Sequence, residues 1–128
     1  MSPDDLVVWR RFLEKLPDVF TDLRYNVRVG TGSKEWDDTK GPVPYEWLCN
    51  CAKRIDAVGE HDGVTCVIEV KPKGGMSALG QVLVYRDLYY RQEKPSNLLG
   101  CWVVCAEADN DCLRTYSAYG VKLIAVGS

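Results

Sequence analysis

The fold is decided by residues 54–85, which read RIDAVGEHDGVTCVIEVKPKGGMSALGQVLVY. Two apolar runs in this stretch have the length of strands, and the turn-prone sequence EHDG joins them. The first run carries Asp56, and the second carries Glu69 and Lys71. Because side chains alternate along a strand, Glu69 and Lys71 are expected on one face. A charged side chain in a half-buried strand needs a partner or a function.

Two carboxylates and a lysine on neighbouring strands suit a hard divalent cation beside a phosphate. We expect Asp56 and Glu69 to bind Mg²⁺ or Mn²⁺ through oxygen, with the backbone carbonyl of Val70 as a third protein ligand. Lys71 would orient the attacking water or neutralise the charge that develops on the phosphate. The pattern therefore indicates phosphodiester hydrolysis.

A helix is predicted to follow, from Ser77 to about Gln92, after the paired glycines at 74–75. Gln81 and Tyr85 stand four residues apart, so both can reach the same edge of the site and position Lys71, a water or the substrate backbone. Tyr85 can equally be a core aromatic, because aromatic residues at helical spacing often are. The predicted buried stripe of the helix consists of Met76, Leu79, Leu83 and Tyr90.

The remaining segments complete a single domain over residues 1–128. Before the central helix, we predict a helix that starts at Ser2-Pro3 and ends before Pro17, a strand at 23–29, a long loop at 30–48, and strands at 53–58 and 65–71. After the central helix, we predict a strand at 98–106, a short helix that is capped by Asp109 or Asp111 and ends at Gly120, and a strand at 121–126. The predicted order is thus α-β-β-β-α-β-α-β.

This order, with RIDAVG on the second strand and IEVK on the third, resembles the PD-(D/E)XK nuclease superfamily over essentially the whole chain. The Gln81-x3-Tyr85 pattern is similar to that of the RecB-like branch. One departure is Ile55, which stands where the name-giving motif has proline. The resemblance implies an α/β (α+β) fold with a restriction-endonuclease-like αβββαβ core, a mixed central sheet flanked by helices, and an extra C-terminal αβ unit. It also implies a Mg²⁺- or Mn²⁺-dependent deoxyribonuclease with Asp56, Glu69, Lys71, Gln81 and Tyr85 at its site.

The family usually takes a further carboxylate from the first helix. Glu14 lies at the margin of the apolar stripe of that helix and is the candidate for catalysis and metal binding. A surface glutamate is the alternative, and the sequence leaves both open. Asp5 is better explained by the helix dipole. His61, in the turn between the two strands, is assigned no role.

DNA is the expected partner, and it would be recognised by structure or by ends rather than by base sequence, since nothing resembles a separate DNA-reading module. Arg54, Lys73 and Arg86 are candidate nucleic-acid contacts, although the net charge of −2 opposes strong phosphate binding. Endonuclease and exonuclease action stay open, as do roles in phage or mobile-element DNA processing, recombination or repair. The alternative function is a catalytically silent nuclease-fold module that binds nucleic acid or protein.

The sequence shows no apolar run of the roughly 20 residues that cross a bilayer and no basic leader, so we expect no membrane association and a cytoplasmic location. The six cysteines are expected to be free, with Cys66, Cys101 and Cys105 acting as small hydrophobic residues inside strands. The spacing of Cys49, Cys51 and Cys112 does not form paired zinc knuckles. A homodimer is a further expectation.

Overall fold

The structure is a computed structural model that describes residues 1–30, 39, 41–42 and 53–128. Its elements are, in chain order, helix α1 (Pro3–Lys15), strands β1 (Thr21–Val29), β2 (Lys53–His61) and β3 (Val64–Gly74), helix α3 (Met76–Glu93), strand β4 (Gly100–Ala108), the 3₁₀ helix η3 (Asn110–Cys112), helix α4 (Leu113–Ala118) and strand β5 (Val121–Ala125). The predicted order is confirmed. Most of the predicted loop at 30–48 lies outside the described residues, as do Cys49 and Cys51.

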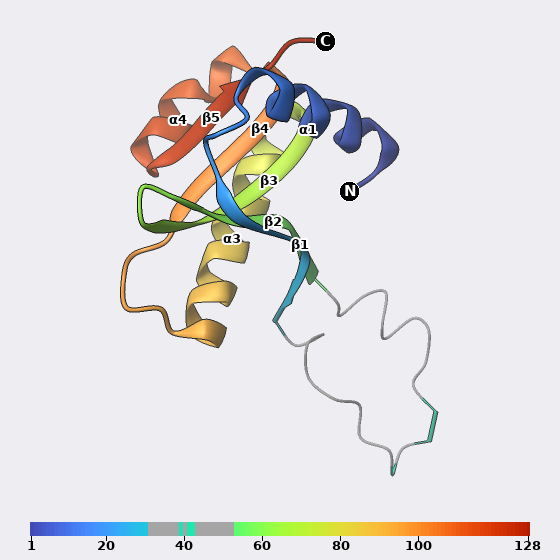
Figure 1. Ribbon diagram of the computed structural model, residues 1–128, viewed down its shortest axis with the longest axis vertical. Coiled ribbons are helices and arrows are strands. Elements are labelled where there is room, and N and C mark those ends of the chain that lie inside the picture. The colour runs from blue at the N-terminus through green and yellow to red at the C-terminus, as the bar shows by residue number, and fades with distance from the viewer. Residues whose placement is uncertain (31–38, 40, 43–52) are drawn as a thin grey trace.

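The five strands form one mixed sheet in the order β1-β2-β3-β4-β5 (Figure 1). The first three strands are antiparallel neighbours, and β3 pairs in parallel with β4, as β4 does with β5. A parallel pair needs a crossover connection, which α3 supplies between β3 and β4 and which η3 with α4 supplies between β4 and β5. The predicted fold class, an α+β domain with a C-terminal αβ unit, is confirmed.

Helices cover both faces of the sheet, and each face has its own core. On one face Trp9 and Phe12 of α1 pack with Ile68 and Val104. On the other face the residues of α3 and α4 pack with those of the strands, and the cluster includes Val67, Val82, Val103 and Tyr116. Figure 1 shows α1 and α3 on opposite sides of the strands. A strand covered on both faces reads as a continuous apolar run, which explains the sequence of β4.

Helix α1 begins with a reciprocal pair of hydrogen bonds. The backbone N–H of Asp5 donates to the Ser2 hydroxyl, and the backbone N–H of Ser2 donates to the Asp5 carboxylate. This capping box satisfies two donors that a helix start leaves unpaired. It also holds Asp5 in a buried position, with only 6% of its surface exposed. The predicted N-terminus of the helix is therefore confirmed, and its first turn carries a buried acid.

Helix α3 buries a different stripe from the predicted one. Its fully buried residues are Ala78, Leu79, Val82 and Tyr89. Met76 and Tyr90 were expected in the core, but they are 80% and 45% exposed, so that part of the prediction was wrong. Polar and apolar residues are spread around the circumference of this helix without a clear apolar stripe, so its sequence alone does not define the buried side.

The described cysteines Cys66, Cys101, Cys105 and Cys112 are free and buried, as expected for small core residues. No helix in the described part of the chain is long and apolar enough to cross a membrane.

The C-terminal unit is tied to the start of α3 by one buried side chain. Asp109 caps η3 by accepting a hydrogen bond from the backbone of Asp111. Helix α4 then places the Tyr116 hydroxyl 2.7 Å from the backbone carbonyl of Gly75, to which it donates. Gly75 is the N-cap of α3. The closing αβ unit therefore fixes the turn that joins β3 to α3.

Tyr116→Phe is expected to lower the free energy of unfolding by about 1 kcal/mol, because it deletes this buried hydrogen bond and leaves the apolar ring in place. Chemical denaturation measures the change. Tyr119→Phe is the matched control, since Tyr119 is 58% exposed and loses the same hydroxyl. Equal stability of the two variants would show that Tyr116 does not anchor the turn.

Candidate active site

The candidate site lies where β2 and β3 separate. Their antiparallel ladder runs from His61↔Val64 to Ala57↔Ile68. Beyond that pair, β2 continues alongside β1 through Ile55, and β3 continues alongside β4 through Glu69. Asp56 and Glu69 are the next residues on the two strands after the last pair. The sheet therefore opens at the two carboxylates that the sequence singled out.

The Asp56 side chain replaces the missing backbone partner. The Val70 N–H donates to Asp56 Oδ2 over 2.8 Å. In an extended strand the N–H and C=O groups of one residue point toward the same neighbouring strand. The carbonyl of Val70 therefore faces the gap between β2 and β3, on the side of Asp56. This orientation matches the expected role of that carbonyl as a ligand.

Glu69 is an acid in a buried position, only 2% exposed. Burial raises its pKa far above the ordinary value of 4.5, and the neighbouring Asp56 raises it further through a hydrogen bond and like charge. Lys71 opposes this shift, with its Nζ 3.8 Å from Glu69 Oε1. The other oxygen, Oε2, is buried and has no hydrogen-bond partner among the described residues. Glu69 thus lacks a full set of partners as a carboxylate.

Helix α1 carries two acids that bear on this site. The charge of Asp5 adds to the raised pKa of Glu69, after the larger effects of burial and Asp56. Glu14, the candidate from the sequence, is exposed, and among the described residues no hydrogen bond or ion pair joins it to the carboxylates. The sequence signal for Asp5 was the Ser2-x-x-Asp5 capping box, which requires the side chain to fold back onto the helix start.

Helix α3 brings Tyr85 to the carboxylates. Burial raises the pKa of the Tyr85 hydroxyl, and the charges of Glu69 and Asp56 raise it further. Gln81 lies one turn earlier and donates from its amide to the Ser77 hydroxyl over 3.1 Å. The structure therefore couples Tyr85 to the site directly, whereas Gln81 is held by its own helix.

The three candidate nucleic-acid contacts are dispersed. Arg54 is exposed on β2, just before Asp56. Lys73 is exposed beyond Lys71 and lies 3.6 Å from Glu107 Oε1, which offsets its charge. Arg86 faces a separate pocket on α3. They do not form one basic patch.

A groove of about 430 Å³ leads to Asp56, and sequence reasoning missed it. It lies between α1 and β1, and it is lined by Met1, Leu6, Trp9, Arg10, Leu13, Tyr25, Asn26 and Asp56. The Trp9 indole N–H donates to the Tyr25 hydroxyl over 3.1 Å, which fixes both rings. No local motif marks the groove, because its walls come from distant parts of the chain.

The oxygen atoms at the strand fork fit a hard divalent cation. They comprise two carboxylates and a backbone carbonyl, and the buried Glu69 Oε2 has no donor to satisfy it. The described residues contain no group of three His, Cys, Asp or Glu side chains arranged as a metal site. Two carboxylates still suffice for Mg²⁺, which commonly keeps waters and takes further oxygens from a phosphate substrate.

No protein-family model and no curated protein matches this chain. Solved structures of similar fold include a repair endonuclease from Pyrococcus abyssi, with a TM-score of 0.60 and 15% identity over 95% of this chain and 46% of that one. An EndoMS–dsDNA2 complex is also similar, with a TM-score of 0.57 and 11% identity over 99% of this chain and 46% of that one.

The chain therefore spans about half the length of these two proteins (46% of each). At such low identity the likeness shows a shared fold. It confirms the nuclease-like fold that the sequence predicted. The RecB-like branch and its Gln81-x3-Tyr85 motif stay predictions.

Glu69→Gln is expected to stabilise the metal-free protein at pH 8 by at least about 1 kcal/mol, or roughly 4 °C in Tm. The pKa of Glu69 is raised on folding, so the folded state holds a proton that the unfolded chain releases above pH 4.5. Stability therefore falls as pH rises from 4.5 towards the raised pKa, and the variant abolishes this loss.

Thermal melts in EDTA at pH 5 and pH 8 measure the effect, with the larger gain expected at pH 8. Glu107→Gln is the control, because Glu107 is largely exposed. An equal or smaller gain at pH 8 than at pH 5 would contradict the buried, protonated state of Glu69.

Proposed function

We propose that this chain is a metal-dependent nuclease that hydrolyses DNA phosphodiester bonds. The observation that carries the proposal is the separation of β2 and β3 at Asp56 and Glu69, with a buried Glu69 oxygen that no described donor satisfies. A buried acid with an unsatisfied oxygen destabilises a fold, and the Lys71 ammonium offsets this only in part, so the presence of Glu69 is best explained by a ligand that compensates it. Mg²⁺ or Mn²⁺ is that ligand, held by Asp56, Glu69 and the Val70 carbonyl.

A divalent cation at these oxygens supplies a water of lowered pKa and stabilises negative charge on the scissile phosphate. The protein's own groups do the rest. Lys71 lies beside Glu69 and is partly exposed, so its ammonium can face the phosphate and offset the charge that develops there. Tyr85 of α3 is partly buried, and the charges of Glu69 and Asp56 act on its hydroxyl, so its ring would limit the access of water to the carboxylates from that side. Gln81 would orient the substrate backbone from the same helix.

DNA is the proposed substrate, selected by structure or by ends. The similar fold of a protein described as a repair endonuclease supports a role in DNA repair. The groove between α1 and β1 supports structure selection, because an apolar groove beside Asp56 offers an unpaired strand more contact than a regular duplex. Cleavage within a strand is the favoured mode. The homodimer stays a prediction from the sequence.

A silent binding module is less well supported. Such a module would gain stability by replacing Glu69 with an apolar residue, since nothing would offset the cost of the buried acid. Its Lys71 would also have no reason to lie against a buried glutamate. The combination of Asp56, Glu69 and Lys71 therefore favours catalysis.

Asp56→Asn and Glu69→Gln are expected to reduce DNA cleavage below detection, and Lys71→Met by about 100-fold, because each group acts on the reacting phosphate or its cation. The assay compares linear, branched and single-stranded DNA with Mg²⁺ or Mn²⁺. Glu107→Gln serves as the control and should cut at the wild-type rate. Undiminished cleavage by Asp56→Asn or Glu69→Gln would place the site elsewhere, and no cleavage of any DNA by the wild type would remove the enzyme proposal.

Asp5→Asn is expected to lower cleavage at least about tenfold, because the Asp5 charge adds to the negative potential that attracts the cation. The amide oxygen can still accept from the Ser2 N–H, so the capping box is retained. Glu14→Gln should stay within a few-fold of the wild type, since Glu14 is exposed. The reverse order of effects would assign the further carboxylate of the site to Glu14.

A further inference from the structure

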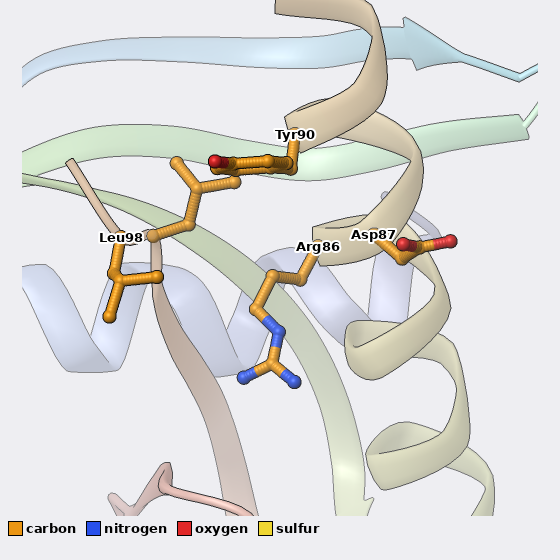
Figure 2. A pocket seen from close by; sticks show the side chains of 5 residues that line it. Arg86, Asp87, Tyr90 and Leu98 are labelled. Carbon is orange, nitrogen blue, oxygen red and sulfur yellow. The ribbon is translucent and has the colours of Figure 1, made fainter. Parts of the chain in front are cut away.

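A second pocket, of about 400 Å³, lies on α3 away from the carboxylates (Figure 2). It is lined by Arg86, Asp87, Tyr90, Leu98 and Leu99. Arg86 and Tyr90 are one helical turn apart, and both project from α3 on the side of Leu98 (Figure 2). The pocket thus combines a guanidinium, an aromatic ring and two aliphatic side chains.

Arg86 has no acidic partner in the part of the chain that the structure describes. No carboxylate there lies within salt-bridge distance of it, and Asp87 pairs with Arg91 at 2.7 Å instead. Figure 2 shows the Asp87 side chain turned away from Arg86. The guanidinium rests against the buried Cys101 thiol, whose pKa it lowers in opposition to burial. A partly buried cation with no counter-charge favours an anionic ligand.

The walls of the pocket are unusually exposed for apolar groups. Leu98 is 85% exposed and Tyr90 is 45% exposed, although both adjoin buried parts of α3 and β4. An exposed tyrosine offers a flat face on which a base can stack, and it loses little side-chain freedom on binding. The ligand that fits is an anion joined to a planar, weakly polar body.

We propose that this pocket binds one unpaired nucleotide of a DNA strand, with its phosphate on Arg86 and its base between Tyr90 and Leu98. The inference rests on the proposed function, since it assigns a second contact to the same substrate. Arg86 directly follows Tyr85 on α3, so a strand that passes Tyr85 can also reach Arg86. A guanidinium binds phosphate in a forked geometry, and the aromatic ring makes the contact independent of base identity.

The test measures binding without cleavage. Fluorescence anisotropy in EDTA compares a short labelled oligothymidylate with a blunt duplex, using the full chain. Tyr90→Leu keeps the apolar volume and removes the ring, and Leu98→Asp places a negative charge at an exposed position, so neither should unfold the protein. Each is expected to weaken binding of the oligothymidylate roughly tenfold and duplex binding far less.

Arg86→Gln should weaken binding of the oligothymidylate to a similar extent. Arg114→Gln removes the same charge from an exposed position on α4, outside the pocket, and it should lower both affinities slightly and equally. Pocket variants that behave like Arg114→Gln, or Arg86-dependent binding of an acidic, aromatic peptide in place of the oligonucleotide, would overturn the assignment. Cleavage by the same variants is measured in a separate assay. The nucleotide pocket can therefore be disproved while the protein still cleaves DNA, and it can be supported even if the protein cleaves no DNA.

Discussion

The hydrogen bond from the Val70 amide to the Asp56 carboxylate is the interaction on which the candidate site depends. A buried amide without a partner is costly, so two paired strands cannot separate freely inside a sheet. Beyond Ala57↔Ile68 the backbone of β2 no longer pairs with β3, and the Asp56 carboxylate accepts the hydrogen bond of the Val70 N–H in its place. The ladder can therefore end at this pair. The space that opens is lined by backbone and carboxylate oxygens. One short side-chain contact thus satisfies the amide at the point where the ladder ends, and the opening beside it is where we propose that a cation binds.

The surroundings of Glu69 disfavour its ionised form and so lower the stability of the fold at this opening. Burial and the neighbouring Asp56 raise the pKa of Glu69, and the charge of Asp5, which the capping box of α1 holds in a buried position, adds to this shift. These effects oppose a charge at Glu69 in the absence of a ligand, and Lys71 offsets them only in part. A fold optimised for stability alone would not keep this arrangement. The proposed function explains the arrangement, because a cation bound to Glu69 would offset this cost.

The sequence predicted the strand order and the central pair of acids because these depend on short-range patterns. Apolar runs with turn residues between them define β2 and β3, and alternation puts Glu69 and Lys71 on one face. Long-range packing was harder to predict. Whether Asp5 or Glu14 of α1 turns inward depends on how the helix docks on the sheet. The buried side of α3 was misjudged at Met76 because polar and apolar residues are spread around this helix and no single apolar stripe marks its buried side.

Calorimetric titration of Mn²⁺ into the wild type and the Asp56→Asn and Glu69→Gln variants tests the account most directly, because it measures the site without assuming a substrate. The account predicts binding by the wild type that both variants lose while their thermal stability in EDTA is kept or increased. Binding that persists in both variants, or no binding by a folded wild type, would contradict it.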